Sequence, residues 1–548
     1  MREGEVRFMK KERLLLLAIT SVIICLSACG KSRQEVSKQD LTVPERLINK
    51  EEVRIAIPTA KFEGGFDPCS GWGTFGGDPI FQSTLTRVDA NNNLGYDIAT
   101  EYKVSEDKKI WKFTIRDDVL CHDGQKLTAK DVAFTYNKAK ELGLAMDFSF
   151  LEKAEATDET HVQFELNTPN SSFLYYTSVL GIVPEHAYGK DYAENPIGSG
   201  PYKFIFEDNG SQLIMEKNEQ YYKSFDGFKR VVLLSMKKDQ AYAAVQAGEV
   251  DVANVETNLA KENIPGYHLE RLASFDFRNI SMPQVKPRTL DDGRKVGNEI
   301  TSELTIRKAI AVGISREEIV KNALYGYGEV AFDMFDRLPW GIKKEFKEFK
   351  DGDIKKAIKI LEDDGWVLNG DVREKSGKKA EFTLMYPTGS LHQLIANAFA
   401  EEVKKLGIRV TPEGLSWTDI APRIRKDPCV FEGGFYNPDR IQGAYQSKYA
   451  FSNSWDNVSA YQNPVVDKHI EAALTEKDPD KSIEEWKKAL WDGKTGGSIL
   501  GDCGYITICY LEHLYFVRDG VDIGNQRVHP HDHGIPITAN IDEWTYKK

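Results

Sequence analysis

The densest group of metal-binding side chains in the sequence lies near its C-terminus, at His529, His531 and His533. Three of the ten histidines fall within these five residues, and Pro530 and Gly534 make a helix unfavourable there. Alternate residues of an extended segment share one face, so the three imidazoles can converge on one ion if the segment curves. Imidazole is a good ligand for nickel, copper and zinc. The spacing therefore predicts a metal-contacting loop, and the alternative is a solvated loop in which one histidine caps backbone carbonyls.

Patterns that would indicate catalysis are otherwise missing from the sequence. It contains no G-x-S-x-G, no H-E-x-x-H and no P-loop, and Ser199 has no base at a recognisable spacing. Gly71, Gly73 and Gly76 satisfy a bare G-x-G-x-x-G, but the Asp and Pro residues before them fit a nucleotide-binding turn poorly. We expect this loop to approach a ligand or a neighbouring segment through its backbone. The protein is predicted to bind its ligand without transforming it.

The first 29 residues have the layout of a secretory signal peptide. Basic residues precede an apolar run from Leu14 to Leu26, which is too short for a comfortable membrane span. The run ends in Leu26-Ser-Ala-Cys29, which resembles the lipobox of bacterial lipoproteins, whose cysteine is acylated and becomes the first mature residue. The resemblance implies a lipid anchor on Cys29, and the alternative is an ordinary signal peptide with a chance cysteine. Residues 30–48 are polar and charged and are predicted to form a flexible tether.

Composition limits the class of protein. The chain of 548 residues is too long for one hydrophobic core, and its 41% hydrophobic and 28% charged residues are typical of globular domains with no second membrane span. A net charge of -12 argues against a nucleic-acid partner. Five cysteines follow Cys29, and their odd number and wide spacing predict buried single thiols instead of disulfides or a zinc cage. They are Cys69, Cys121, Cys429, Cys503 and Cys509.

Residue periodicity indicates an α/β protein. Segments 52–60 and 111–116 alternate apolar and polar residues, as strands do. Thr128 is placed to cap the N-terminus of a helix, with Asp131 completing a capping box. Apolar residues recur at helical spacing in 398–406, and a glycine follows as a C-terminal stop. Helices that alternate with short strands predict an α/β architecture.

The order of these motifs resembles that of the family-5 extracellular solute-binding proteins, which serve peptide and nickel ABC importers. The matching segments in chain order are 116–124, 127–134, 182–186, 196–204, 241–252, 302–310, 314–319, 325–328, 355–366 and 398–410. The resemblance covers nearly all of the mature chain. It implies a two-lobe α/β fold of the periplasmic-binding-protein type II-like class, with an extra subdomain in the first lobe.

The same resemblance implies an order of domains along the chain. The first lobe would span 49–280, with the subdomain inserted at about 95–195, and the second lobe would span 281–505. Residues 506–548 would return to complete the first lobe. A ligand would be trapped between the two lobes when the hinge closes.

Six residues are expected to contact that ligand. They are Trp72, Arg278, Trp417, Phe435, Tyr436 and Asp439. Peptide-binding members of the family carry an aspartate near 431–440 that pairs with the peptide's α-ammonium group. This sequence has Phe435, Tyr436 and Asn437 at that point, and Asp439 is displaced. The aromatic residues would suit a chelate or a modified peptide. The alternative is that they belong to the core. Arg278 is placed to meet a ligand carboxylate, and the alternative is a structural ion pair.

The resemblance implies a lipid-anchored binding protein on the extracytoplasmic face of the cell membrane. It would deliver a short peptide, or a nickel ion or nickel chelate, to the permease subunits of an ABC importer. No cofactor is required, and Ni²⁺ would be cargo held by the three histidines. The alternative from a different class is a peptide-sensing or adhesive surface lipoprotein without a transport role.

Overall fold

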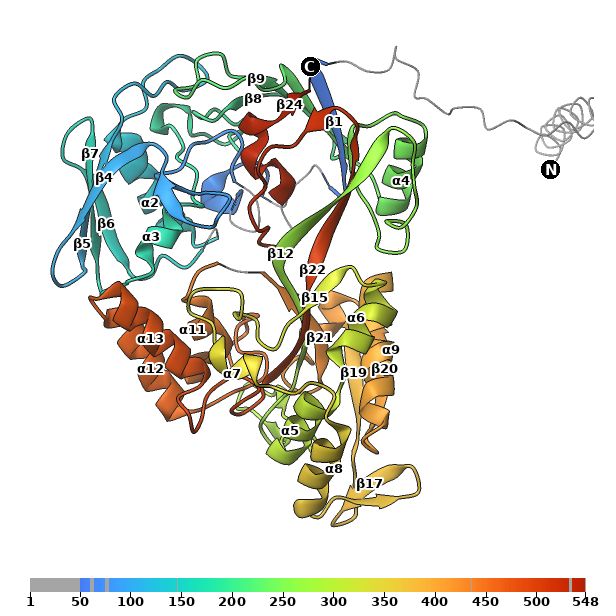
Figure 1. The fold of residues 1–548 in the computed structure, drawn as a ribbon. Coiled ribbons are helices and arrows are strands. Elements are labelled where there is room, and N and C mark those ends of the chain that lie inside the picture. Colours follow the sequence, from blue (N-terminus) through green and yellow to red (C-terminus); the bar gives the residue numbers. More distant parts are fainter. Residues whose placement is uncertain are drawn as a thin grey trace, which may run out of the picture. The chain divides into compact units, whose positions relative to one another are not determined.

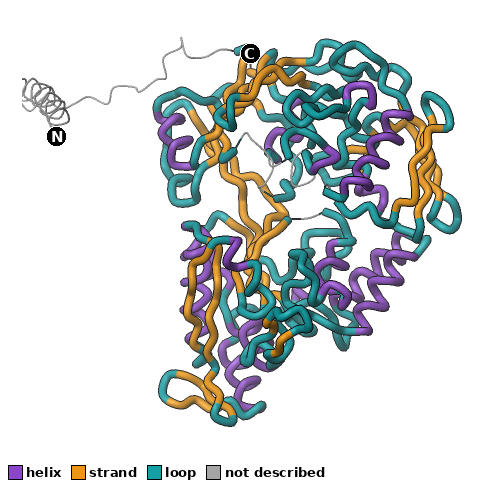
Figure 2. Tube along the Cα trace, turned by 180° about the vertical axis from the view of Figure 1, so that it is seen from behind, coloured by secondary structure: helices purple, strands orange, loops and turns teal. Residues whose placement is uncertain are grey.

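Two long strands, β12 (Tyr267–Ser281) and β22 (Tyr505–Arg518), run antiparallel through the computed structural model and connect its two lobes (Figure 1). The structure describes residues 50–59, 64–73, 78–144, 146–434, 436–531 and 535–547. Tyr267 pairs with Arg518 at the first-lobe end of the two strands, and Ser281 pairs with Tyr505 at the second-lobe end. Seen from behind, the same two strands link the lobes (Figure 2).

One large sheet continues from lobe to lobe through these strands. Its order is β20-β19-β21-β12-β22-β11-β1-β10-β9-β8, and β15 also pairs with β22. The second-lobe strands are β15 (Gly328–Val330), β19 (Glu381–Pro387), β20 (Arg409–Leu415) and β21 (Cys429–Gly433). The first-lobe strands are β1 (Glu52–Ile57), β8 (Tyr202–Glu207), β9 (Gln212–Lys217), β10 (Arg230–Ser235) and β11 (Val252–Asn254). This arrangement confirms the predicted two-lobe α/β fold.

Helices cover the sheet in both lobes. The first lobe carries α4 (Lys238–Gln246), and the second carries α5 (Leu304–Gly313), α6 (Arg316–Leu324), α7 (Lys344–Lys347), α8 (Ile354–Asp363), α9 (Ser390–Lys404), α10 (Trp417–Ile420), α11 (Arg440–Tyr445), α12 (Pro464–Thr475) and α13 (Pro479–Leu490). The predicted stop after α9 is present, since Gly407 adopts φ +75°, a left-handed conformation that favours glycine.

A separate four-stranded antiparallel sheet lies in the first lobe. Its order is β4-β5-β7-β6, from β4 (Ala99–Val104), β5 (Ile110–Ile115), β6 (Leu151–Ala156) and β7 (His161–Leu166). Helix α2 (Ala129–Leu142) packs on β6 and β7, and the short helix α3 (Phe173–Tyr176) follows β7. The predicted capping box of α2 is confirmed, because Asp131 accepts a hydrogen bond from the Thr128 amide at 2.7 Å.

Short elements complete the described chain. The remaining strands are β2 (Thr86–Val88), β3 (Leu94–Tyr96), β13 (Arg288–Thr289), β14 (Lys295–Val296), β16 (Val367–Asn369), β17 (Val372–Lys375), β18 (Lys378–Lys379), β23 (Val521–Asp522) and β24 (Thr545–Tyr546). The 3-10 helices are Pro68–Ser70, Glu185–Ala187, Ser447–Tyr449 and Pro536–Glu543. The last of them lies in the segment after β22, which packs on the first lobe.

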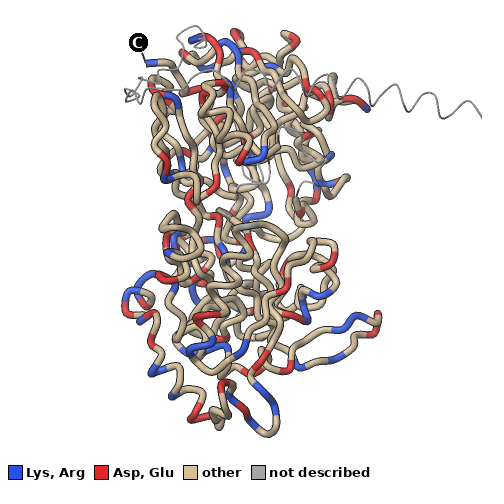
Figure 3. The backbone as a smooth tube through the Cα atoms, turned by 90° about the vertical axis from the view of Figure 1, so that its right-hand side faces the viewer, with Lys and Arg blue, Asp and Glu red and all other residues tan. Residues whose placement is uncertain are grey.

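The cysteines and the charged residues lie where the composition leads us to expect them. All five cysteines after Cys29 are buried free thiols, as predicted. Acidic and basic residues are interspersed along the chain in both lobes (Figure 3). Among the described residues, no helix has the length and apolar character that a membrane crossing requires.

Candidate ligand-binding site between the lobes

The two connecting strands are irregular at the point where the chain passes between lobes. Pairing of β12 with β22 is interrupted between Ala273 and Phe277, and again between Arg278 and Asn279. A third segment joins the strands here, because Ser274 forms an isolated bridge with His529 of the returning chain. The amide of Phe275 donates to the His529 carbonyl at 2.7 Å. Bulges bend and twist a strand, and we refer to this crossing point between the lobes as the hinge region, or hinge.

A buried ionic cluster occupies the hinge. Arg278 forms ion pairs with the fully buried Asp276 and, at 2.9 Å, with Glu432 of β21. Glu432 also contacts Nε2 of His392 at 2.8 Å. Burial raises the pKa of Glu432, but the charge of Arg278 and the hydrogen bond from His392, together with the nearby histidine charges, lower this pKa to about 2. Arg278, predicted as a ligand contact, thus already serves two protein carboxylates.

Two histidines extend this cluster toward the first lobe. Nδ1 of His513 lies 3.0 Å from Nδ1 of His529, and its Nε2 lies 3.3 Å from Asp276. The other ring nitrogen of His529 contacts Oε1 of Gln526 at 3.1 Å. Burial is the largest cause that lowers the pKa of His529 well below its ordinary value. His529 is therefore a neutral, hydrogen-bonded part of the hinge.

The predicted three-histidine metal site stays a prediction. His531 is 8% exposed, and its Nε2 lies 3.6 Å from Asp276. His533 lies outside the described residues. Within the described part of the chain, no group of three His, Cys, Asp or Glu side chains is arranged to hold a metal ion.

The predicted aromatic residues lie in three places. Trp72 is buried in the first-lobe core, where its ring lies 5.1 Å from that of Phe66. Trp417 belongs to a second-lobe cluster, with its ring 5.3 Å from the half-exposed Trp455. Tyr436 lies at the hinge, with its ring 5.9 Å from that of Phe275. Phe435 lies outside the described residues. Of these, Tyr436 is the residue that the structure places between the lobes.

Tyr436 meets a first-lobe cation. The guanidinium of Arg527 lies 5.5 Å from the centroid of the Tyr436 ring. Nη2 of Arg527 donates to Asp78 at 2.8 Å. Among the described residues, neither Nε of Arg527 nor the hydroxyl of Tyr436 has a hydrogen-bond partner, although both atoms are buried. Burial raises the pKa of Tyr436 to about 12, so its hydroxyl remains a proton donor at neutral pH.

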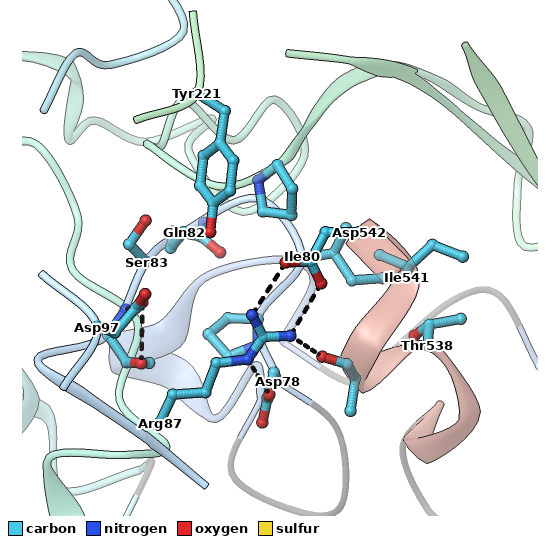
Figure 4. A pocket seen from close by; sticks show the side chains of 14 residues that line it. Asp78, Ile80, Gln82, Ser83, Arg87, Asp97, Tyr221, Thr538, Ile541 and Asp542 are labelled. Carbon is cyan, nitrogen blue, oxygen red and sulfur yellow. Dashed lines mark hydrogen bonds and ion pairs between the residues drawn. The ribbon is translucent and has the colours of Figure 1, made fainter. Parts of the chain in front are cut away.

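A small first-lobe cavity of about 30 Å³ lies behind Asp78 (Figure 4). Arg87 is central to its wall, where it bonds Asp542 at 2.9 and 3.1 Å and the Ala539 carbonyl, and lies 3.6 Å from Asp78. This space holds about one or two water molecules and is too small for a peptide. A row of alternating charges thus runs from the C-terminal 3-10 helix to the interlobe surface. Its members, in order, are Asp542, Arg87, Asp78 and Arg527.

The lobes also touch at the rim, between α3 and the α12–α13 pair (Figure 1). The hydroxyl of Tyr176 donates to Asp439 of the second lobe. Ser171 donates from its amide to the Leu474 carbonyl at 3.2 Å and from its hydroxyl to the Ala473 carbonyl at 3.1 Å. Burial raises the pKa of Asp439. Asp439, which the sequence predicted as a ligand contact, therefore bridges the two lobes.

Several residues of this interface carry no sequence signal. Tyr176 and Asp439 are 263 positions apart, and Asp78 and Arg527 are 449 positions apart. No local motif marks such pairs, because the first forms where the two lobes meet and the second depends on the return of the chain to its first lobe.

Comparison with known proteins identifies the family. Residues 93–447 match the family described as "Bacterial extracellular solute-binding proteins, family 5 Middle". The chain is 30% identical over 493 residues to Protein XP55 of Streptomyces lividans, covering 85% of each chain. It is 26% identical over 515 residues to the oligopeptide-binding protein AppA of Bacillus subtilis, covering 87% of this chain and 91% of AppA.

A solved structure supports the same assignment. NikZ from Campylobacter jejuni, in complex with Ni(L-His), superposes with a TM-score of 0.76 and 25% identity, covering 91% of this chain and 100% of NikZ. The family whose model matches this chain is one of solute-binding proteins. The chain belongs to the family-5 bacterial extracellular solute-binding proteins, as its motifs predicted.

Proposed function

We propose that this protein captures a small solute between its two lobes and delivers it to an ABC importer. The observation that carries the proposal is the interlobe surface itself. Side chains of both lobes meet at the hinge, through Tyr436 and Arg527, and at the rim, through Tyr176 and Asp439. Polar atoms buried at such a surface are the groups that fix the orientation of a bound ligand.

The cargo is a short peptide or a nickel chelate. AppA is an oligopeptide-binding protein and NikZ was solved with Ni(L-His), so the relatives include both ligand classes. The interlobe surface presents a cation at Arg527 and a carboxyl group at Asp439, which matches a ligand with both charges. The histidine segment 529–533 would add imidazole ligands for the metal of a chelate.

The protein is held at the extracytoplasmic face of the membrane by a lipid on Cys29. The support is the lipobox-like Leu26–Cys29 after an apolar run, followed by the polar tether 30–48. Labelled palmitate should be incorporated into the wild-type protein and not into Cys29→Ser. Labelling of Cys29→Ser at the wild-type level would contradict the anchor.

Calorimetric titration of the mature chain from Gly30 onward tests the cargo. Ni²⁺ is titrated with and without L-histidine, and a pool of di- to pentapeptides is titrated separately. A chelate cargo predicts nickel binding that is lost in His531→Ala and His533→Ala. His268→Ala is the matched control, because His268 is an exposed first-lobe histidine that pairs with Glu270 and Asp519.

Either type of binding should reduce the radius of gyration in X-ray scattering, because the ligand favours the closed lobes. Saturable peptide binding without a nickel response would assign the protein to peptide uptake. No binding of either class would contradict the proposed function.

A further inference from the structure

The guanidinium of Arg527 is buried with part of its hydrogen-bonding capacity unused. The residue is 8% exposed, and one of its N–H groups is taken by Asp78 at 2.8 Å. Its Nε–H finds no acceptor in the part of the chain that the structure describes. A guanidinium has five N–H donors, and leaving one buried without an acceptor is unfavourable. Among the described residues this atom has no acceptor, so it is available to a bound ligand.

A second buried donor without a partner belongs to the neighbouring residue Tyr436. The Tyr436 hydroxyl is buried and has no partner among the described side chains and backbone groups. Its ring lies 5.5 Å from the Arg527 guanidinium, so the two donors without partners belong to neighbouring side chains. A group that bonds both of them would join the lobes.

The row of charges behind Arg527 holds its guanidinium in place. Asp78 accepts a hydrogen bond from Arg527 at Oδ1, and its Oδ2 lies 3.6 Å from Nε of Arg87, an ion pair that is too long for a hydrogen bond. Arg87 is fixed in turn by Asp542. Asp78 contacts Arg527 at Nη2 only, so the Nε–H of the guanidinium is left without an acceptor among the described residues.

We propose that Arg527 and Tyr436 bind a carboxylate group of the cargo, one oxygen accepting from each lobe. An arginine edge matches the planar carboxylate, and a charge-assisted hydrogen bond is stronger than a neutral one. This inference depends on the proposed function and narrows it to solutes that carry a carboxylate. Both the C-terminus of a peptide and the amino acid of a nickel chelate supply this group.

Pairs of probes that differ only in the carboxylate test the proposal by calorimetry. Trialanine is compared with trialanine amide, and Ni²⁺ with L-histidine is compared with Ni²⁺ with L-histidinamide. In the pair that binds, the wild-type protein should favour the acid by about 10- to 100-fold. The two pairs also distinguish a peptide carboxylate from that of a chelate.

Variants assign the preference to the two residues. Arg527→Gln should bind acid and amide equally, and Arg527→Lys should keep part of the preference because it keeps the charge. Tyr436→Phe should weaken binding of the acid about 5-fold and binding of the amide less, because a charged acceptor forms the stronger hydrogen bond. Arg230→Gln is the matched control, since Arg230 is a half-exposed first-lobe arginine that pairs with Glu216. Thermal unfolding of each variant shows whether it folds.

Equal wild-type affinity for acid and amide would overturn the inference and leave the proposed function intact. An undiminished preference for the acid in folded Arg527→Gln would also overturn it. Failure of the wild-type protein to bind any of the four probes would overturn the proposed cargo classes, and the inference with them. The wild-type comparison needs no variant, so it stands even if Arg527→Gln does not fold.

Discussion

The phenol of Tyr176 in the first lobe donates a hydrogen bond to the carboxylate of Asp439 in the second lobe. This bond lies at the rim, and the nearby rings of Tyr175 and Trp340 add an edge-to-face contact with centroids 5.6 Å apart. The contacts involve protein groups alone. These contacts stabilise the arrangement of the lobes in this structure, and a ligand that favours the same arrangement adds to that stabilisation.

Removing the hydroxyl of Tyr176 should shift the protein toward open lobes. We expect Tyr176→Phe to increase the radius of gyration of the ligand-free protein and to weaken ligand binding about 5- to 10-fold, because one hydrogen bond to a carboxyl group is lost. Tyr192→Phe is the control, since the Tyr192 hydroxyl donates to Ile197 within the first lobe at 2.7 Å. A radius that changes equally in both variants would argue against a rim contact that controls closure.

Gly434 should be needed for the lobes to meet near the hinge. A Cβ at this position would lie 2.3 Å from the carbonyl oxygen of Pro530 in the returning chain. Gly434→Ala is therefore expected to hold the two segments apart and weaken binding by about tenfold or more, since the competent closed state becomes rarer. Gly95→Ala, whose nearest atom would be 3.8 Å away, serves as the control. Unchanged ligand affinity in Gly434→Ala would show that this contact is not needed.

Arg278 should matter more for stability than for ligand affinity. Arg278→Met leaves Asp276 and Glu432 buried without their cation and should lower the free energy of unfolding by about 3–5 kcal/mol in chemical denaturation. Arg271→Met, which breaks a half-exposed pair with Glu512, should cost about 1 kcal/mol or less. A stable Arg278→Met with reduced affinity would instead support the ligand contact that the sequence predicted.

Asp333 should make stability fall as pH rises. Burial is the main cause that raises its pKa to about 8, and the charge of Asp336 adds to it. The unfolded pKa is about 3.9, so between about pH 4 and pH 8 the native state holds a proton that the unfolded chain releases. Its contribution to the free energy of unfolding is complete below this window and falls by about 1.4 kcal/mol per pH unit across it.

Thermal unfolding from pH 5 to pH 9 checks this dependence. Asp333→Asn should lose the decline and gain stability relative to the wild type as pH rises. The exposed Asp117→Asn is the control. If the unfolding temperatures of Asp333→Asn and the wild type changed with pH in parallel, Asp333 would not titrate in this window.

Local sequence predicted the elements well and the binding surface only in part. The capping box at Thr128 and the glycine after α9 depend on neighbours within a few residues, so both could be predicted and both are present. Tyr436 was identified because it lies in a motif whose place in the family is known. Asp78 and Arg527 were missed, because their contact is set by the path of the whole chain. Trp72 and Trp417 show the converse, since aromatic type alone does not distinguish a core position from a ligand contact.

The shared sheet also sets the order in which the molecule can be completed during synthesis. β1 is among the first strands to emerge. Its neighbour β11 pairs on its other side with β22, which begins about 450 positions after β1. Until β22 arrives, β11 and the first half of β12 present unpaired edges, and such edges promote association with other chains. The large sheet is therefore completed only when the residues of β22 have been made. A premature stop before Tyr505 would yield a protein that retains most of its residues and lacks the strand that joins its halves.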